Sequence, residues 1–307
     1  MGGYLFLGHR KMKYNKPPTS FSQQVDILES RGMSIPDKNL ASHYLSHINY
    51  YRLSEYWLPF ESNHGDHTFH PGTTFEQVLA IYILDRELRL LVMDAIERIE
   101  ISVRTQWAYH FSHRYGPHAY LDSNLFKTKW NHQANLGKLK YEVAASQETF
   151  IQHLRNKYDE TLPPIWAVVE IMTLRQLSKW FANLTHGKDR NTVAHVYDMD
   201  EINLTSYLHH LSTVRNVCAH HSRLWNREFT FTYKLPTKRP QIIVNSLNRN
   251  QPRKLYNTLV MLEYLMEKIS PGTHWKQRLF ELLKKHPVVN PATMGFPENW
   301  QALSIWN

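Results

Sequence analysis

The chain has 307 residues, of which 42% are hydrophobic and 13% aromatic, enough for a sizeable core, which excludes a disordered tail. It carries 36 Lys and Arg against 27 Asp and Glu, a net charge of +9 with neutral histidine. An excess of this size favours polyanionic partners, nucleic acid first. The single cysteine, Cys218, excludes an intrachain disulfide and a cysteine-rich zinc site, and it fits a reducing cytoplasm.

No apolar run reaches the length of a membrane-spanning helix, and the apolar patch in residues 1–16 is too short for the core of a signal peptide. We therefore expect a cytoplasmic protein without membrane contact. The chain has no internal repeat, low-complexity tract or linker, so residues 12–307 are predicted to form one mainly helical domain. Residues 1–11 are predicted to be an N-terminal extension, because the fold is expected to begin at KYNKPPTSFSQQ.

The N-terminal part of the chain predicts two helices and a loop. The first helix covers residues 20–31, with capping residues at its start and Gly32 after its end. The second covers residues 35–60, where apolar and aromatic residues recur at helical spacing: Leu40, Tyr44, Leu45, Ile48, Tyr51 and Leu53. Residues 61–74, ESNHGDHTFHPGTT, contain Gly, Pro and polar residues throughout and are predicted to be a loop.

Residues 75–115 contain no Gly or Pro, and their apolar stripe predicts one long amphipathic helix. The stripe consists of Ile81, Leu84, Leu88, Leu91, Val92, Ala95, Ile99 and Val103. On another face Glu97, Glu100 and Arg104 stand three and four residues apart, which is typical of a solvated face with salt bridges.

The rest of the chain is also predicted to be mainly helical. The further helices are expected over residues 131–157, 165–185, 188–197, about 200–225 and 253–285. Between residues 229 and 254, β-prone residues interrupted by prolines predict a loop or a short hairpin. The tail 286–307 is predicted to be irregular, with aromatic anchors. The fold class is therefore all-α, a helical bundle.

The stretch VRNVCAHHSRLWNRE, residues 214–228, contains the residues of greatest chemical interest. On a helix with about 100° per residue, Arg215 falls on an apolar stripe. The other members of that stripe are Leu204, Leu208, Leu211 and Cys218. A guanidinium keeps its charge, so a buried Arg215 needs a carboxylate, a cleft or an anionic ligand. A purely structural explanation is that Glu97 or Glu100 satisfies it.

Asn216, His220 and Arg223 form a polar stripe beside Arg215, and this group suits the cleavage of RNA by its own 2′-hydroxyl. Such cleavage needs a base for the hydroxyl proton, an acid for the leaving 5′-oxygen and positive charge for the transition state. Histidine supplies the proton transfers, arginine binds phosphate oxygens, and asparagine positions the histidine or bonds the ribose. One helix presents a catalytic histidine on only one of its faces. Two copies of the motif in a symmetric dimer would therefore supply both proton transfers without a metal.

The stretch RNVCAH matches the arginine-asparagine-x3-histidine signature of HEPN ribonucleases at Arg215, Asn216 and His220. The wider sequence resembles the bacterial abortive-infection (Abi-like) family over nearly the whole chain after Met12. The segments that carry this resemblance are, in chain order, YNKPPTSFSQQVDILESRGM, INYYRLSEYWLPF, YILDRELRLLVMDAIERIEISVRT, RNVCAHHSRLWNRE and MGFPENWQALSIW.

The resemblance implies an HEPN-type helical fold, a toxin role in defence against phage, and endoribonuclease activity. It also implies that a homodimer joins two motifs into one composite active site, and that an inhibitory RNA or protein antitoxin holds the toxin in check. We expect no cofactor. The residues expected to be catalytic are Arg215, Asn216 and His220, with His221, Arg223, Glu97 and Glu100 in support.

The two adjacent histidines are alternatives for the catalytic role, because HEPN-type spacing tolerates either. On a continuous helix His220 shares a face with Asn216, whereas His221 points toward the apolar side near Cys218. This favours His220 as the catalytic histidine and His221 as a packing or supporting residue.

Further basic residues are predicted to hold the RNA backbone: Arg104, Lys238, Arg239, Arg249, Arg253 and Lys254. The main alternative is a non-catalytic RNA-binding or regulatory module, which predicts binding without cleavage and a salt dependence from phosphate contacts. A third class, in which the scaffold is the target or partner of a nucleotidyltransferase, predicts a modified tyrosine or RNA end.

Other chemistries are less favoured by the sequence. The stretch HGDHTFH, residues 64–70, has a spacing that can bind zinc through His64, Asp66, His67 and His70, but histidines in a flexible loop without supporting partners usually bind no metal. There is no Gly-rich phosphate loop, paired-carboxylate nuclease motif or nucleophile elbow, which argues against nucleotide hydrolysis and esterase activity. The aromatic residues of NYYRLSEYWLPF could stack unpaired bases, but at helical spacing they are more typical of a core.

Overall fold

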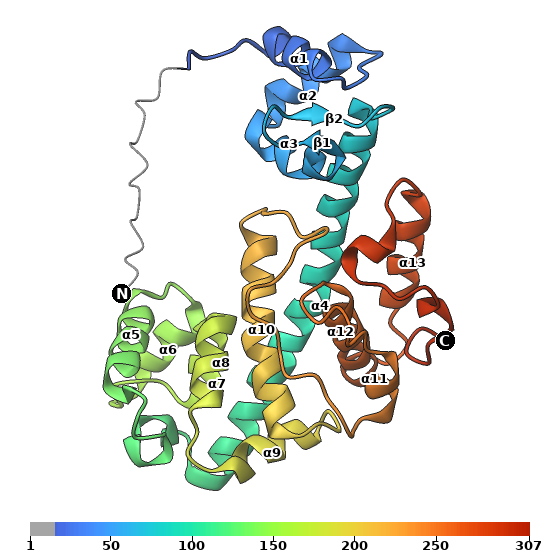
Figure 1. The fold of residues 1–307 in the computed structure, drawn as a ribbon. Coiled ribbons are helices and arrows are strands. Elements are labelled where there is room, and N and C mark those ends of the chain that lie inside the picture. The colour runs from blue at the N-terminus through green and yellow to red at the C-terminus, as the bar shows by residue number, and fades with distance from the viewer. Residues whose placement is uncertain (1–15) are drawn as a thin grey trace, which may run out of the picture. The chain divides into compact units, whose positions relative to one another are not determined.

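The computed structural model describes residues 16–307, so the predicted extension 1–11 lies outside the described residues. Within residues 16–307 the protein has thirteen α-helices and one two-stranded sheet, which confirms the all-α prediction (Figure 1). The chain divides into two compact units, one ending at Leu79 and the other covering Ala80–Asn307. The single domain over residues 12–307 is not tested by this division and stays a prediction.

The first unit has three short helices where the sequence predicted two. They are α1 (Phe21–Ser30), α2 (Lys38–His47) and α3 (Tyr50–Trp57), followed by the 3-10 turn η1 (Leu58–Phe60). The predicted helix 35–60 is interrupted because Asn49 caps α3 and accepts a hydrogen bond from the Tyr51 N–H at 2.9 Å. Tyr51, predicted to face the core, is 71% exposed, since it lies on the outer side of the separate helix α3.

The predicted loop 61–74 contains a small hairpin, in which β1 (Glu61–Asn63) pairs antiparallel with β2 (Thr68–Phe69). The carboxylate of the buried Glu61 contacts Nδ1 of His64 at 2.8 Å and Nδ1 of His67 at 3.2 Å. Among residues 16–307 there is no group of three or more potential ligands that could hold a metal ion. These two histidines therefore have a partner inside the hairpin itself.

The long helix α4 covers Phe75–Tyr115, the bounds that the sequence predicted. All members of the predicted apolar stripe from Ile81 to Val103 are buried. The face predicted to be solvated is only partly so: Glu97 is exposed, but Glu100 and Arg104 are half-buried. The spacing of the apolar residues thus correctly predicted the helix. The partial burial of Glu100 and Arg104 indicates that they contact another part of the protein.

The second unit adds nine helices to α4. They are α5 (His132–Ala145), α6 (Thr149–Lys157), α7 (Ile165–Ile171), α8 (Leu174–Ala182), α9 (Gly187–His195), α10 (Glu201–Ala219), α11 (Gln241–Ser246), α12 (Tyr256–Ile269) and α13 (Trp275–Lys285). The segment predicted as a loop or hairpin, 229–254, forms no strand and contains α11. The tail is irregular as predicted, apart from the short 3-10 turns η4 (Pro291–Met294) and η5 (Trp300–Ala302).

Three further predicted helices are each interrupted in the structure. The predicted helix 131–157 is interrupted between α5 and α6, where residues 146–148 are extended or irregular. The predicted helix 165–185 is interrupted by a capping box, in which Thr173 and Gln176 satisfy the first N–H groups of α8. The predicted helix 253–285 is interrupted by Pro271 and Gly272, the latter with a φ of 77°.

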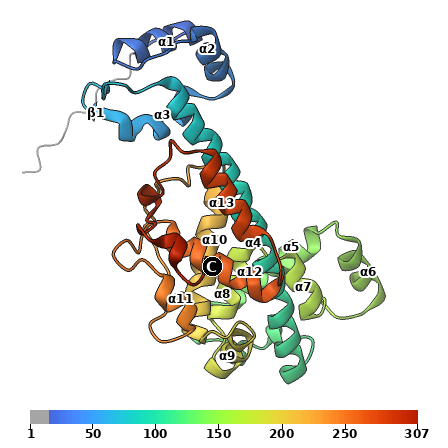
Figure 2. The ribbon, with the colours of Figure 1, turned by 90° about the vertical axis from the view of Figure 1, so that its right-hand side faces the viewer.

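The core of the second unit is built around α4, α10 and α12. Helices α4 and α10 lie side by side and run antiparallel (Figures 1 and 2). The Ser102 hydroxyl on α4 is 2.8 Å from the Tyr197 hydroxyl, which precedes α10. Helix α12 is buried on every side from Tyr256 to Met266, as expected for a helix inside a core. This arrangement fixes the end of α10 against the first half of α4.

Glu263 is an ionisable residue at the centre of α12, and it is 0% exposed. Neither of its carboxylate oxygens has a hydrogen-bond partner within residues 16–307. Burial raises the pKa of Glu263 to about 7 from its ordinary value of 4.5, although Lys276 opposes this shift. The unfolded chain ionises this group at lower pH than the folded protein does. The stability of the fold therefore falls as pH rises from 4.5 toward 7.

We expect Glu263→Gln to raise the thermal midpoint at about pH 8, because the amide avoids the cost of ionising a buried carboxyl. The gain should be absent at about pH 4, where the carboxyl of wild type is protonated in both states. Thermal melts across this pH range measure the effect. The control is Glu281→Gln, since Glu281 is exposed on α13. A gain that does not change with pH would contradict the assignment.

Candidate functional site

The arginine-asparagine-x3-histidine motif lies in the last turn of α10 and just beyond it. Arg215 and Asn216 are helical and half-buried, whereas His220 is the C-cap residue and is exposed. The His220 N–H donates to the Asn216 carbonyl at 3.0 Å. The helix predicted to continue to about residue 225 thus ends at Ala219, and the motif occupies a helix end rather than a helix interior.

The chain leaves α10 through a Schellman-type turn. The Ser222 N–H donates to the Val217 carbonyl at 2.9 Å, and the His221 N–H donates to the Cys218 carbonyl at 3.0 Å. This turn holds His221 in the left-handed region with a φ of 56°. That conformation costs a residue with a side chain roughly 1–2 kcal/mol. His221 was predicted to point toward Cys218, which is wrong, because His221 lies outside the helix and is exposed.

The loop after α10 is held by a buried ion pair on α4. Asp85, which is 0% exposed, accepts the backbone N–H of Leu224 at 3.0 Å and that of Trp225. Its other carboxylate oxygen pairs with Arg89, one turn further along α4. Arg89 in turn donates to the Ser222 carbonyl at 3.5 Å. One carboxylate on α4 thus determines the path of the chain directly after the motif.

Arg215 lies near Glu100 on α4, one of the two carboxylates that the sequence analysis considered for it. Burial raises the pKa of Glu100, while the positive charges of Arg104 and Arg215 oppose this shift. Glu97, the other carboxylate considered, is exposed. Glu100 also forms an ion pair with Arg104. The charge of Glu100 is therefore influenced by two guanidinium groups, but its ion pair is with Arg104.

Arg104, predicted to bind RNA, belongs to an ion-pair cluster between α4 and α7. Its side chain is 14% exposed and pairs with Glu100 and, at 3.5 Å, with the Glu170 carboxylate. It also donates to the carbonyls of Glu170 and Met172, which the end of α7 leaves without helical partners. A phosphate could bind Arg104 only by displacing some of these contacts.

Most of the other predicted RNA-binding residues also have partners in the protein. Arg249 donates to the Pro236 carbonyl, Arg253 to the Phe229 carbonyl at 2.9 Å, and Lys254 to the Asn226 side chain at 2.8 Å. Arg223 is half-buried in the loop that Asp85 holds. Lys238 and Arg239 are exposed before α11 and make no ion pair within residues 16–307. Of the predicted set, these two are the most accessible to a phosphate.

Two cations that were not predicted from the sequence, Arg175 and Lys179, lie where α8 packs on α10. They stand one turn apart and are exposed. Burial lowers the pKa of His209 on α10, and the charges of Arg175 and Lys179 lower it further. His209 lies on the same helical face as His220, about three turns before it. The four-residue spacing could have been noticed in the sequence, but the proximity to His209 depends on tertiary packing.

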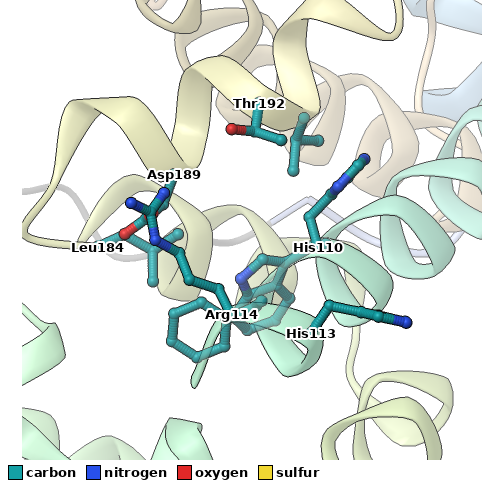
Figure 3. A pocket seen from close by; sticks show the side chains of 9 residues that line it. His110, His113, Arg114, Leu184, Asp189 and Thr192 are labelled. Atoms are coloured by element: carbon teal, nitrogen blue, oxygen red, sulfur yellow. The ribbon is translucent and has the colours of Figure 1, made fainter. Parts of the chain in front are cut away.

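A separate cavity of about 320 Å³ lies between the C-terminal part of α4 and α9 (Figure 3). His110 and Arg114 line it from α4, and Asp189 and Thr192 line it from α9. Arg114 pairs with Asp189 at 2.9 Å, and burial lowers the pKa of His110. The cavity is therefore close to neutral. His110 lies about 15 Å along α4 from Glu100, so this cavity is distinct from the motif.

These observations define a helical protein whose candidate site is a histidine-containing helix end beside exposed cations. Residues 43–226 match the family model described as Abi-like protein, and the chain therefore belongs to the Abi-like protein family. The matched segment includes the motif and ends in the loop held by Asp85. Comparisons with curated proteins and with solved structures find no match. No helix within residues 16–307 is long and apolar enough to cross a membrane.

We expect Asp85→Ala to lower the free energy of unfolding by about 3–5 kcal/mol, because it removes the carboxylate beside the buried Arg89 and the acceptor of two N–H groups. Denaturant unfolding followed by circular dichroism measures this loss. The control is Asp94→Ala on the same helix. Its carboxylate pairs with the exposed Arg98 and Arg278, so its removal should cost about 1 kcal/mol or less. Equal losses in the two variants would argue against the role given to Asp85.

Proposed function

We propose that the protein is a metal-independent endoribonuclease toxin that acts in abortive infection. The observation that carries the proposal is the end of α10, where Arg215, Asn216 and His220 lie within about two helical turns. Membership in the Abi-like family supports the role in defence. The net charge of +9 fits a polyanionic substrate. Restraint by an inhibitory RNA or protein antitoxin is part of the same proposal.

The proposed reaction is a transesterification within RNA. The 2′-hydroxyl loses its proton and its oxygen attacks the adjacent phosphorus. The bond from phosphorus to the 5′-oxygen then breaks, and the 5′-oxygen takes up a proton, which leaves a 2′,3′-cyclic phosphate on the upstream fragment. His220 is exposed at the helix cap, where its imidazole carries one of these protons. Arg215 donates to the non-bridging oxygens and stabilises the charge of the transition state.

Two proton transfers require two groups, and the end of one α10 helix presents one motif. A homodimer in which two motifs face each other supplies a base from one protomer and an acid from its partner. Asn216 lies one turn before His220, and its side chain is placed to hold the imidazole or the ribose. The composite site thus needs no group beyond the side chains of the two motifs.

The RNA backbone is proposed to follow the surface where α8 packs on α10. Arg175 and Lys179 bring like charges together there beside His209, an arrangement that a bound phosphate stabilises. Because His209 and His220 share a face of α10, a strand bound at these cations reaches the motif. Lys238 and Arg239 are further exposed cations.

RNA binding without cleavage is the second candidate function, and the proximity of Arg215 to Glu100 favours it. An arginine satisfied by a carboxylate can have a purely structural role. However, the ion pair of Glu100 is with Arg104, and Arg104 also pairs with Glu170, so two carboxylates lie beside the two guanidinium groups. The catalytic proposal therefore rests on the position of Arg215 at the end of α10 together with Asn216 and His220.

In EDTA, wild type is expected to cut total cellular RNA and to leave 2′,3′-cyclic phosphate ends. Arg215→Ala and His220→Ala should each cut at least about 100-fold more slowly, because they lose transition-state charge stabilisation and proton transfer. Mapping of the cut ends measures this. The matched control is His153→Ala, which removes an exposed histidine on α6 and should leave cutting unchanged. If wild type binds RNA but leaves it intact, binding without cleavage replaces the catalytic proposal.

His221→Gly separates the roles of the two adjacent histidines in the same assay. Glycine adopts a φ of 56° without strain, so this variant should be as stable as wild type or more stable by about 1 kcal/mol. Cutting should persist, because His220 remains. Loss of cutting by a variant that is still fully folded would assign the proton transfer to His221 instead.

We expect Lys179→Ala to weaken RNA binding at low salt and to make the slope of log K against log salt shallower by about 0.7–1, the contribution of one phosphate contact. Titrations of a labelled single-stranded RNA at several salt concentrations measure the slope. Lys140→Ala, which removes an exposed lysine on α5, is the control. A slope identical in both variants would place the RNA backbone elsewhere.

A further inference from the structure

A second cavity, of about 340 Å³, lies between the end of α6 and the start of α7. It is lined by two large aromatic side chains that are half exposed, Tyr158 at 50% and Trp166 at 54%. Three prolines contribute to its walls, Pro117, Pro163 and Pro164. Large aromatic side chains usually bury most of their surface, so a pair left open at a cavity indicates a place for a flat ligand.

The walls of this cavity are held in place by the protein alone. The Ile165 N–H donates to the Pro117 carbonyl at 2.9 Å, which ties the segment after α4 to the start of α7. The hydroxyl of Tyr120, which is 0% exposed, donates to the Pro163 carbonyl at 2.7 Å. Proline also restricts the backbone of the wall. A ligand would therefore enter a site that needs little ordering on binding.

The cavity also contains polar groups suited to a planar ligand. Nε2 of His118 is buried and has no hydrogen-bond partner within residues 16–307. An atom that is closed to water is also closed to a ligand atom of similar size, so the ligand contacts other groups of the wall. Arg155 lines the cavity and is exposed, and the Lys157 ammonium lies 5.5 Å from the centre of the Tyr158 ring. The ligand thus meets two aromatic faces, with the cation of Arg155 and the carboxylate of Glu160 both at the cavity.

Helix α7 connects this cavity to the candidate site. Trp166 and Glu170 are four residues apart and both exposed, so they lie on one face of α7, about 6 Å apart along its axis. The Glu170 carboxylate is 3.5 Å from the Arg104 guanidinium, which also pairs with Glu100. Glu100 lies near Arg215. Tyr115, at the end of α4 beside the cavity wall, lies about 22 Å along that helix from Glu100, so an RNA strand bound at Arg215 reaches Trp166 only after several nucleotides.

We propose that this cavity binds one base of a single-stranded RNA whose strand continues, several nucleotides further on, to the motif, an inference that rests on the proposed ribonuclease function. The base stacks on Trp166 and Tyr158, with Arg155 at the cavity for a flanking phosphate. A base inside a duplex is already stacked and cannot enter, so the site selects unpaired RNA. A proline-rich peptide also suits aromatic grooves, and the binding of a labelled peptide distinguishes it from RNA.

Binding is measured with a fluorescein-labelled single-stranded oligoribonucleotide whose 2′-hydroxyls are methylated, which prevents cleavage. Trp166→Ala should raise Kd by about 5- to 100-fold, the loss expected when a stacked base loses its aromatic platform. Trp166→Phe, which keeps an aromatic face, should restore most of the affinity. The salt slope should equal that of wild type, because stacking involves no phosphate. The matched control is Tyr141→Ala, since Tyr141 is 76% exposed on α5 and does not line the cavity.

The outcomes separate this inference from the ribonuclease proposal. If Trp166→Ala binds as tightly as Tyr141→Ala, or if its salt slope becomes shallower, the base site is wrong, while cleavage of unmodified RNA still decides the enzyme activity. Binding that depends on Trp166 without any cleavage supports the base site and removes the proposed activity. If wild type binds a labelled proline-rich peptide through Trp166 but does not bind the RNA, the base site is overturned.

Discussion

The buried carboxylate of Asp85 is the interaction on which the candidate site depends. It accepts the N–H groups of Leu224 and Trp225, 139 and 140 residues away in the chain, and so satisfies donors that would otherwise favour another turn of helix. Because these donors are held by α4, α10 ends at Ala219 and presents His220 at its cap. The position of the motif on the surface is thus a consequence of helix packing as much as of the motif itself.

The sequence predicted those parts of the fold whose signals are local. Helix α4 was predicted with its observed bounds, because its apolar period runs without a Gly or Pro. The breaks at Thr173 and at Pro271 also have local signals, a capping residue and a proline followed by glycine, which were overlooked in favour of continuous periodicity. The end of α10 is different, since no residue near Ala219 indicates that a carboxylate on another helix will hold the following loop.

The candidate site likewise depends partly on the local sequence and partly on contacts between residues far apart in the chain. The need of Arg215 for a carboxylate followed from its place on an apolar stripe, and Glu100 is near it. The RNA-binding roles were chosen by charge alone, and charge does not reveal that Arg104 and Arg253 donate to backbone carbonyls. A guanidinium has five donors, so it readily fixes loops and helix ends. Exposed cations such as Lys179 became apparent only with the packing of α8 on α10.

The left-handed backbone at His221 restricts which residues the chain can accept there. Glycine fits without cost, asparagine and aspartate fit with little, and β-branched side chains are strongly disfavoured at a φ of 56°. A β-branched replacement would favour opening of the turn and would draw the following backbone away from Asp85. Few substitutions at this position are therefore compatible with the turn. It keeps an imidazole or takes one of a few small residues, none of which titrates near neutral pH.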